Sequence, residues 1–104
     1  MREEIVLYST CGNEDEALRI ARALVDERLA ACVNVLPAVR SIYRWLDKVE
    51  EAGEVLLIIK STQARMERLR NRIAELHSYD VPEIIALPIV AGSEKYLAWL
   101  REQV

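Results

Sequence analysis

The one histidine of the chain stands in the segment HSYDVPEII, residues 77–85, beside acidic and phenolic side chains. His77 and Glu83 are residue types that bind metal ions or transfer protons, and the thiol of Cys11 or Cys32 can approach from elsewhere. Imidazole together with thiolate favours copper or zinc. Because no HxH, HxxxH or CxxC spacing occurs, the fold must bring such ligands together, within one chain or between chains. Alternatively, His77 is a structural side chain that interacts with the carbonyl end of a helix.

Two further side chains are candidates for chemistry. Cys11 lies between a predicted strand and a predicted helix, where a helix N-terminus lowers the pKa of a thiol. It is either a partly ionised thiol or a small residue in a tight turn. Lys60 ends a buried strand, which is a common position for a ligand pocket. The sequence leaves both interpretations of Cys11 open.

The residues indicate no reaction and no nucleic-acid partner. A phosphate-binding loop after the first strand needs an arginine, but residues 9–16 (STCGNEDE) hold one glycine and three acids. No Ser-His-Asp or Cys-His pairing follows from the spacing. The 17 acids and 14 bases give a net charge of −3, and the chain has no phenylalanine, which disfavours RNA or DNA binding. We therefore expect neither an enzyme nor a nucleic-acid-binding protein.

The chain length and hydrophobic periodicity predict one domain over residues 1–104. Asn13 is a predicted helix N-cap with Glu16 three residues later, as in a capping box. Ser61 or Thr62, and then Ser93, are predicted to cap the later helices. The expected order is strand 4–10, helix 14–29, strand 31–46 interrupted by Pro37, a turn at 47–53, strand 54–61, a helix ending near residue 77, strand 83–90 and a short terminal helix.

This order predicts an α+β fold of the ferredoxin-like type, βαββαβ, with an extra C-terminal helix. The antiparallel sheet then has the order 4-1-3-2, which puts the second and fourth strands at the edges. Pro37 and Pro88 fall in those two strands, and proline is largely confined to edges, strand starts and bulges because it donates no ladder hydrogen bond.

The second strand is too long for the domain that it belongs to. Residues 31–46 would span roughly 50 Å at ~3.3 Å per residue, whereas a covering helix of about 15 residues spans ~23 Å. The hairpin formed with the third strand must therefore project as an arm, or fold back over its own sheet. Its tip carries exposed apolar side chains, which favours packing on neighbouring subunits. The predicted interface residues are Ile42, Tyr43 and Trp45.

The charged residues at the start of the chain and its two cysteines predict the cellular compartment of the protein. Arg2, Glu3 and Glu4 follow Met1 where a secretory signal needs an apolar segment, and no apolar run reaches the ~20 residues that cross a bilayer. Cys11 and Cys32 fit free thiols in a reducing compartment. We expect a cytoplasmic protein with no membrane partner.

Three stretches carry a resemblance to a known family: LAACVNVLPAVRSIYRW at 29–45, LLIIKST at 56–62, and HSYDVPEIIALPI at 77–89 followed by YLAWL. They resemble the CutA proteins, which are named for tolerance to divalent cations. The resemblance implies a ferredoxin-like subunit similar to the PII signalling proteins, assembled as a cytoplasmic homotrimer through long β arms. It also implies a response to metal ions, copper binding, no enzymatic activity and no required cofactor.

The chain departs from the family pattern at the proposed copper ligands. The usual His-Pro-Tyr is His77-Ser78-Tyr79 here, and copper-binding relatives have a cysteine at the position of Ser9 and a second histidine at that of Leu76. Of that set His77 remains, so a divalent ion would bind through His77 and Glu83, with Cys11 as a further candidate.

Two other functions are open at this point. A PII-like regulator would bind a small anionic ligand in the cleft between subunits, with Lys60, Tyr43 and Trp99 as the predicted contacts. A trimer without a ligand could instead be a scaffold for a partner protein.

Overall fold

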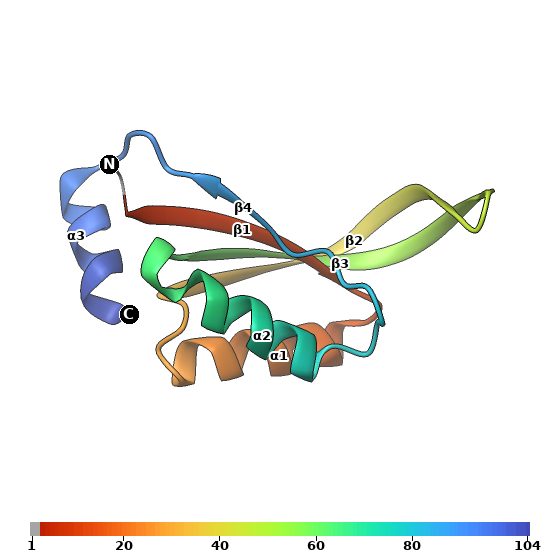
Figure 1. Ribbon diagram of the computed structural model, residues 1–104, viewed down its shortest axis with the longest axis horizontal. Coiled ribbons are helices and arrows are strands. Elements are labelled where there is room, and N and C mark those ends of the chain that lie inside the picture. Colours follow the sequence, from red (N-terminus) through yellow and green to blue (C-terminus); the bar gives the residue numbers. More distant parts are fainter. Residues whose placement is uncertain (1–2) are drawn as a thin grey trace.

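The computed structural model describes residues 3–104, and its element order is the predicted one (Figure 1). Strand, helix, two strands, helix, strand and a final helix follow one another, as in a ferredoxin-like βαββαβ unit with an extra C-terminal helix. The elements are β1 (Glu4–Cys11), α1 (Glu14–Asp26), β2 (Cys32–Trp45), β3 (Lys48–Thr62), a 3-10 turn (Gln63–Arg65), α2 (Met66–Leu76), β4 (Ile85–Pro88) and α3 (Glu94–Gln103).

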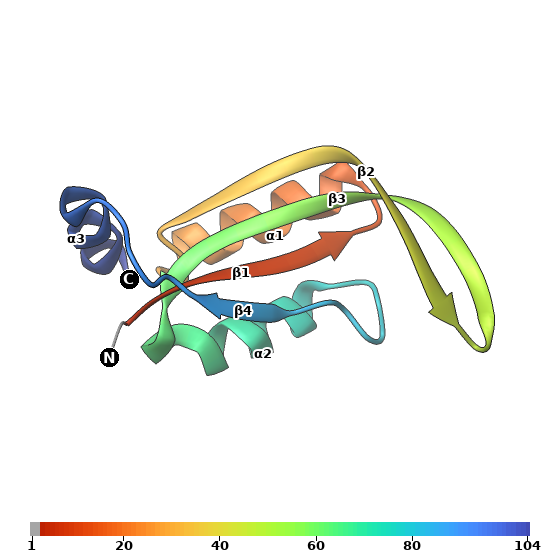
Figure 2. The same ribbon diagram turned by 90° about the horizontal axis from the view of Figure 1, so that it is seen from above.

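The four strands form one antiparallel sheet in the order β2-β3-β1-β4, which confirms the predicted order 4-1-3-2. Helices α1 and α2 cover one face of this sheet, and α3 lies at the end opposite the β2–β3 hairpin (Figures 1 and 2). Both prolines lie in edge strands as expected. Pro37 falls in a register shift between Leu36 and Val39, and Pro88 is the last residue of β4.

The core lies between the sheet and the two covering helices. Over residues 5–9 of β1 and 55–61 of β3, buried residues alternate with less buried ones because successive side chains of a strand point to opposite faces. The buried set faces the apolar stripes of α1 and α2 and holds the helices on that side of the sheet. Its fully buried members include Leu7, Leu57, Ile59, Ile20, Leu24, Leu69 and Ile73.

Helix α1 begins where the sequence predicts and ends three residues early. The Asn13 side chain accepts a hydrogen bond from the Glu16 N–H at 2.8 Å, as an N-cap does. Arg28 has φ of 58°, a left-handed conformation that stops the helix. The N–H groups of Leu29 and Ala30 both bond the Leu24 carbonyl. The prediction that the helix continues to residue 29 was therefore wrong, although Leu29 is buried in the core.

Neither predicted cap of the second helix makes its capping bond. Thr62 precedes the 3-10 turn but its side chain makes no cap hydrogen bond. The hydroxyl of Ser61 instead donates to the Leu29 carbonyl at 2.6 Å, which ties β3 to the segment after α1. Ser93 does cap α3, since its hydroxyl accepts from the Tyr96 N–H. The last strand is shorter than the predicted 83–90.

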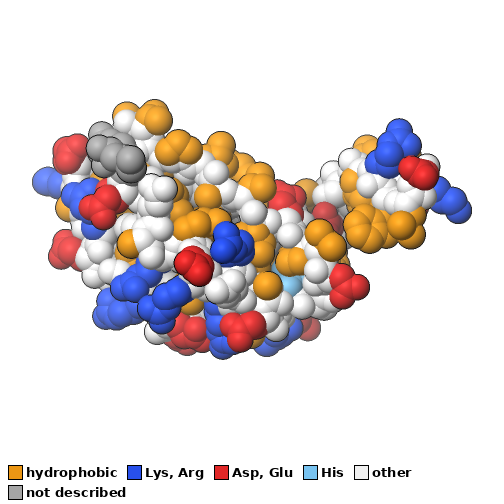
Figure 3. Space-filling view, viewed as in Figure 1, with side chains coloured by type: hydrophobic (Ala, Val, Ile, Leu, Met, Phe, Trp, Pro, Cys, Tyr) orange, Lys and Arg blue, Asp and Glu red, His pale blue; other side chains and the backbone are white. Residues whose placement is uncertain are grey.

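The β2–β3 hairpin projects as an arm, and its turn lies earlier than predicted. Leu46 and Asp47 form the two-residue turn with positive φ of 50° and 64°, so residues 48–53 belong to β3 rather than to a loop. The molecule measures 44 × 25 × 24 Å, and the arm extends past α1 and α2 and bends toward the side of β4 (Figure 2). Its tip stands apart from the body (Figure 3), with Ile42 69% and Leu46 82% exposed.

Within residues 3–104, none of the helices combines the length and the apolar character needed to cross a membrane.

Candidate functional site

His77 follows α2 directly, and both of its ring nitrogens make hydrogen bonds. Nε2 lies 2.7 Å from the carbonyl oxygen of Thr10, and Nδ1 accepts from the Tyr79 N–H at 3.1 Å. Because a carbonyl only accepts, Nε2 carries the proton and Nδ1 presents its lone pair. The side chain is fully buried and points into the protein between β1 and the end of α2. The imidazole therefore holds a structural position with a defined tautomer, but its carbonyl partner belongs to β1 and not, as predicted, to the end of a helix.

Glu16 of α1 faces the same imidazole and was not predicted as a site residue. Its Oε2 accepts from the Ser78 N–H at 3.0 Å, so the carboxylate turns toward the end of α2. Its Oε1 lies 4.0 Å from Nδ1 of His77. Glu16 is only 6% exposed, and among residues 3–104 no group donates a hydrogen bond to that Oε1.

A signal for Glu16 was present in the sequence. It stands four residues before Ile20 and eight before Leu24, on the stripe of α1 that faces the core. An acid on that stripe needs a polar partner, because burying a carboxylate without one is costly. The capping-box pattern gave Glu16 another explanation and concealed this role.

Cys11 ends β1 and is completely buried beside the two groups above. Burial, and then the nearby carboxylates of Glu16 and Glu54, raise the pKa of this thiol to about 11, although Arg19 acts in the opposite direction. The shift is opposite to the one that a partly ionised thiol requires. Cys11 also pairs with Val55 as the last residue of β1, so it does not lie in the tight turn of the other alternative. Cys32 is half-buried, and both thiols are free.

Cys11, Glu16 and His77 together form a cluster of potential metal ligands, which we call the Cys-Glu-His cluster. One ligand atom of each lies within 4.8 Å of the others, and all three residues are buried. They come from β1, α1 and the residue after α2, so only the folded chain assembles them. In the part of the chain that the structure describes, no other group of three His, Cys, Asp or Glu meets this criterion.

At the positions where relatives have their proposed copper ligands, this chain lacks a complete set of metal-binding side chains. The Ser9 hydroxyl is fully buried, and within the described residues it has no hydrogen-bond partner. Leu76 contributes an apolar side chain that packs against the core. Without the thiolate and the second imidazole, His77 alone does not fit a copper site at these positions.

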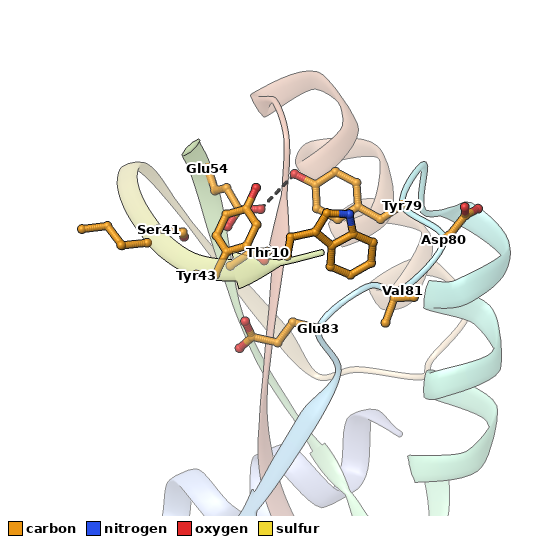
Figure 4. Close-up of a pocket in the computed structure, with 10 residues that line it drawn as sticks. Thr10, Ser41, Tyr43, Glu54, Tyr79, Asp80, Val81 and Glu83 are labelled. Atoms are coloured by element: carbon orange, nitrogen blue, oxygen red, sulfur yellow. Dashed lines mark hydrogen bonds between the residues drawn. The ribbon is translucent and has the colours of Figure 1, made fainter. Parts of the chain in front are cut away.

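Glu83 lies in a different place, a cleft of about 620 Å³ between the arm and the segment that precedes β4 (Figure 4). The hydroxyl of Tyr79 donates to Glu54 across this cleft at 2.9 Å. Burial, and then this bond, raise the pKa of Tyr79 to about 12. The cleft combines aromatic rings with carboxylates, contributed by Tyr43, Trp45, Tyr79, Glu54, Asp80 and Glu83.

The three residues predicted to bind a small ligand do not meet within one chain. Tyr43 lies on the arm, whereas Lys60 pairs with Cys32 at the other end of the hairpin. The Lys60 ammonium contacts the Asn34 side chain, and Trp99 packs against Tyr96 on α3 with ring centroids 5.5 Å apart. A shared cleft would need residues from different subunits, so this site stays a prediction. The predicted metal site also remains a prediction. Cys11 and His77 lie together, whereas Glu83 lies in the cleft.

Both the sequence and the fold of the chain are similar to those of known proteins. The family model described as "CutA1 divalent ion tolerance protein" matches residues 5–103. The "Divalent-cation tolerance protein CutA" of Thermus thermophilus is 53% identical over 100 residues, covering 96% of each chain. "Protein CutA, chloroplastic" of Arabidopsis thaliana is 48% identical over 93% of this chain, which spans only 53% of that protein.

A solved structure agrees with the sequence comparison. The "Divalent cation tolerance protein (Cut A1)" of Thermus thermophilus superposes with a TM-score of 0.95 at 51% identity, covering 96% of this chain and 97% of that one. The family model covers nearly the whole sequence and the fold matches over the same length, so the chain belongs to the CutA1 divalent ion tolerance protein family.

Proposed function

We propose that this protein acts in divalent-cation tolerance by binding divalent metal ions, and that it catalyses no reaction. The observation that carries the proposal is its 53% identity, over 96% of both chains, to a relative named for divalent-cation tolerance. The description of the family likewise names tolerance to divalent ions and no reaction. The buried Cys-Glu-His cluster supports the proposal because it gathers three kinds of metal-ligand atom in one place.

The proposed assembly is a homotrimer. The arm tip exposes Ile42, Trp45 and Leu46, which are costly to leave in water and which an adjoining subunit can cover. The sheet face that α1 and α2 leave open gives a second reason, because Ile85 and Leu87 of the edge strand β4 are 49% and 42% exposed. The unpaired edges of β2 and β4 provide the backbone groups for pairing between chains.

The proposed location is the cytoplasm, which the two free thiols support. The Arabidopsis relative is named as chloroplastic, so the compartment needs its own measurement in each organism. Fractionation of cells that express the full-length protein should place it in the soluble cytoplasmic fraction. Recovery with an organelle or with the periplasm would refute this part of the proposal.

The ions that we propose are those of the later transition series, including zinc and copper, rather than calcium or magnesium. Thiol and imidazole groups bind the former, whereas hard cations take oxygen ligands. Binding of a small anion is the alternative function. The cleft that holds Tyr43 argues against an anion there, because its lining residues include three carboxylates and no lysine or arginine.

Calorimetric titration of the full chain distinguishes these functions. We expect Zn²⁺ or Cu²⁺ to bind and equal concentrations of Ca²⁺, Mg²⁺ and ATP to give no heat of binding. Binding of ATP without binding of any transition ion would replace cation tolerance with the PII-like alternative. Sedimentation of the same sample should give the mass of three subunits, and a monomer would contradict the proposed assembly.

A further inference from the structure

We infer that a divalent cation of the zinc type is bound within one subunit by Sγ of Cys11, Nδ1 of His77 and Oε1 of Glu16. The inference rests on the proposed function, since it names the residues that hold the ion which that function requires. It differs from the set predicted from the sequence, because the carboxylate comes from Glu16 of α1 and not from Glu83 of the cleft.

The first reason is the way in which the backbone holds the imidazole. Nε2–H of His77 donates to the Thr10 carbonyl at 2.7 Å, which leaves Nδ1 as the atom with a lone pair. A histidine that binds a metal almost always donates its other N–H to a carbonyl or carboxylate, which fixes the ring and its tautomer. His77 therefore already has the outer contact that a metal-binding imidazole needs.

The second reason is that Glu16 is held in the same manner. One carboxylate oxygen, Oε2, accepts from the Ser78 N–H at 3.0 Å. The other oxygen, Oε1, is buried, has no hydrogen-bond partner among residues 3–104, and lies 4.0 Å from Nδ1 of His77. A buried carboxylate oxygen without a partner is costly, and a cation between it and Nδ1 would remove that cost.

The third reason is the chemistry and charge of the complete set. Sulfur, nitrogen and oxygen donors from three side chains suit tetrahedral Zn²⁺, with solvent as the fourth ligand. On binding, the Cys11 thiol releases its proton to solvent and forms the metal–sulfur bond. The thiolate and the carboxylate then balance the two positive charges of the ion, while the partner of Glu16 at the surface, Arg19, is 58% exposed and screened by water.

The required movement is small. Nδ1 of His77 and Oε1 of Glu16 lie 4.0 Å apart, and one ligand atom of each of the three residues lies within 4.8 Å of the others. Bond lengths of about 2.0–2.3 Å place tetrahedral ligands about 3.5 Å apart. The ion thus draws the three side chains together by about 1 Å. It also replaces the Tyr79 N–H as the partner of Nδ1, which releases the turn that follows α2.

Titration of the full chain with Co²⁺, followed by displacement with Zn²⁺, tests the site through the absorption of a thiolate–cobalt bond. Cys11→Ser should abolish this absorption and Glu16→Gln should weaken binding at least about tenfold. Two matched controls should leave both signals unchanged. Cys32→Ser removes the other thiol, and Glu14→Gln changes an exposed acid one half-turn from Glu16.

The outcomes separate this site from the proposed function. Wild-type affinity in both Cys11→Ser and Glu16→Gln, or loss of affinity in Glu83→Gln alone, would overturn the Cys-Glu-His site while ion binding stands. Failure of the wild-type protein to bind Co²⁺, Zn²⁺ or Cu²⁺ would overturn the site and the proposed function together. Circular dichroism and urea unfolding of each variant identify any loss of affinity that comes from misfolding.

Discussion

The imidazole of His77 donates to the backbone carbonyl of Thr10 at 2.7 Å, which joins the end of α2 to the end of β1 across 67 residues of sequence. The contact is buried, so it excludes water from the hydrogen bond. It orients the ring toward Glu16 and holds the segment that leads from α2 to the cleft. The residue that follows α2 thus connects this helix to β1 and also lies at the centre of the candidate site.

Removal of the hydrogen bond between His77 and Thr10 should destabilise the fold. We expect His77→Ala to lower the free energy of unfolding by about 1–3 kcal/mol, because the Thr10 carbonyl is left buried without a donor. Urea unfolding at a fixed protein concentration measures the change. Arg70→Ala, on the exposed face of α2, is the control and should stay within about 0.5 kcal/mol. Equal losses in the two variants would contradict a structural role for His77.

Stability should fall as the pH rises above 9. Cys11 has a pKa of about 11 in the folded protein, against 9.0 for an ordinary thiol, because of its burial. Between these values the unfolded chain loses the thiol proton while the folded chain keeps it, so the unfolded state binds fewer protons and gains stability. The urea concentration at the midpoint of unfolding, measured at pH 8, 9, 10 and 11, should therefore decrease as the pH rises above 9.

The Cys11→Ser variant identifies the source of that decline. It lacks the thiol, so its midpoint should fall less than that of the wild type between pH 9 and 11. Tyr79, whose pKa is raised to about 12 by burial, adds a further decline from pH 10 upward in both proteins. Parallel curves for the two proteins across pH 9–11 would show that Cys11 titrates as it does in the unfolded chain.

The ion pair between Arg101 and Glu4 should contribute more to stability than the pair between Arg72 and Glu27. Arg101 Nη1 lies 2.7 Å from the carboxylate of Glu4, which is only 3% exposed, and the pair fastens α3 to β1. Glu27 is 40% exposed, so water screens its pair with Arg72. Arg101→Ala should lower the urea midpoint more than Arg72→Ala, and the reverse order would refute this ranking.

The arm should carry the contacts that hold the subunits together. Trp45 is 51% exposed within one subunit, so an interface can cover about half of the roughly 150–250 Å² of a tryptophan, worth about 2–3 kcal/mol at ~25 cal/mol per Å². Trp45→Ala should therefore shift the assembly toward smaller species. Sedimentation at micromolar concentration measures the shift. Arg44→Ala, a change at an exposed charged residue next in sequence, should leave the assembly intact. An assembly of unchanged mass in Trp45→Ala would exclude this ring from the proposed interface.

The sequence predicted the fold because its signals are local and repeated. The apolar runs of β1 and β3, the helical stripes of α1 and α2, and prolines at two edge strands all agree with one topology. The boundaries were less predictable where backbone conformation decides them. Arg28 ends α1, and Leu46 begins the arm's turn, in left-handed conformations that arginine and leucine do not favour.

The candidate site was only partly predictable because its members are far apart in sequence. His77 and Cys11 were identified by their chemistry, and the fold brings them together. Glu16 was missed because the N-cap pattern explained it locally, while its carboxylate turns to Ser78, 62 residues away. Glu83 is close to His77 in sequence, but it lines the cleft.

The most direct test of the account is X-ray absorption at the zinc edge of the zinc-loaded full-length protein. We predict one sulfur ligand at about 2.3 Å together with nitrogen and oxygen ligands at about 2.0–2.1 Å, and loss of the sulfur contribution in Cys11→Ser but not in Cys32→Ser. A ligand shell of nitrogen and oxygen alone in the wild-type protein would contradict the assigned site.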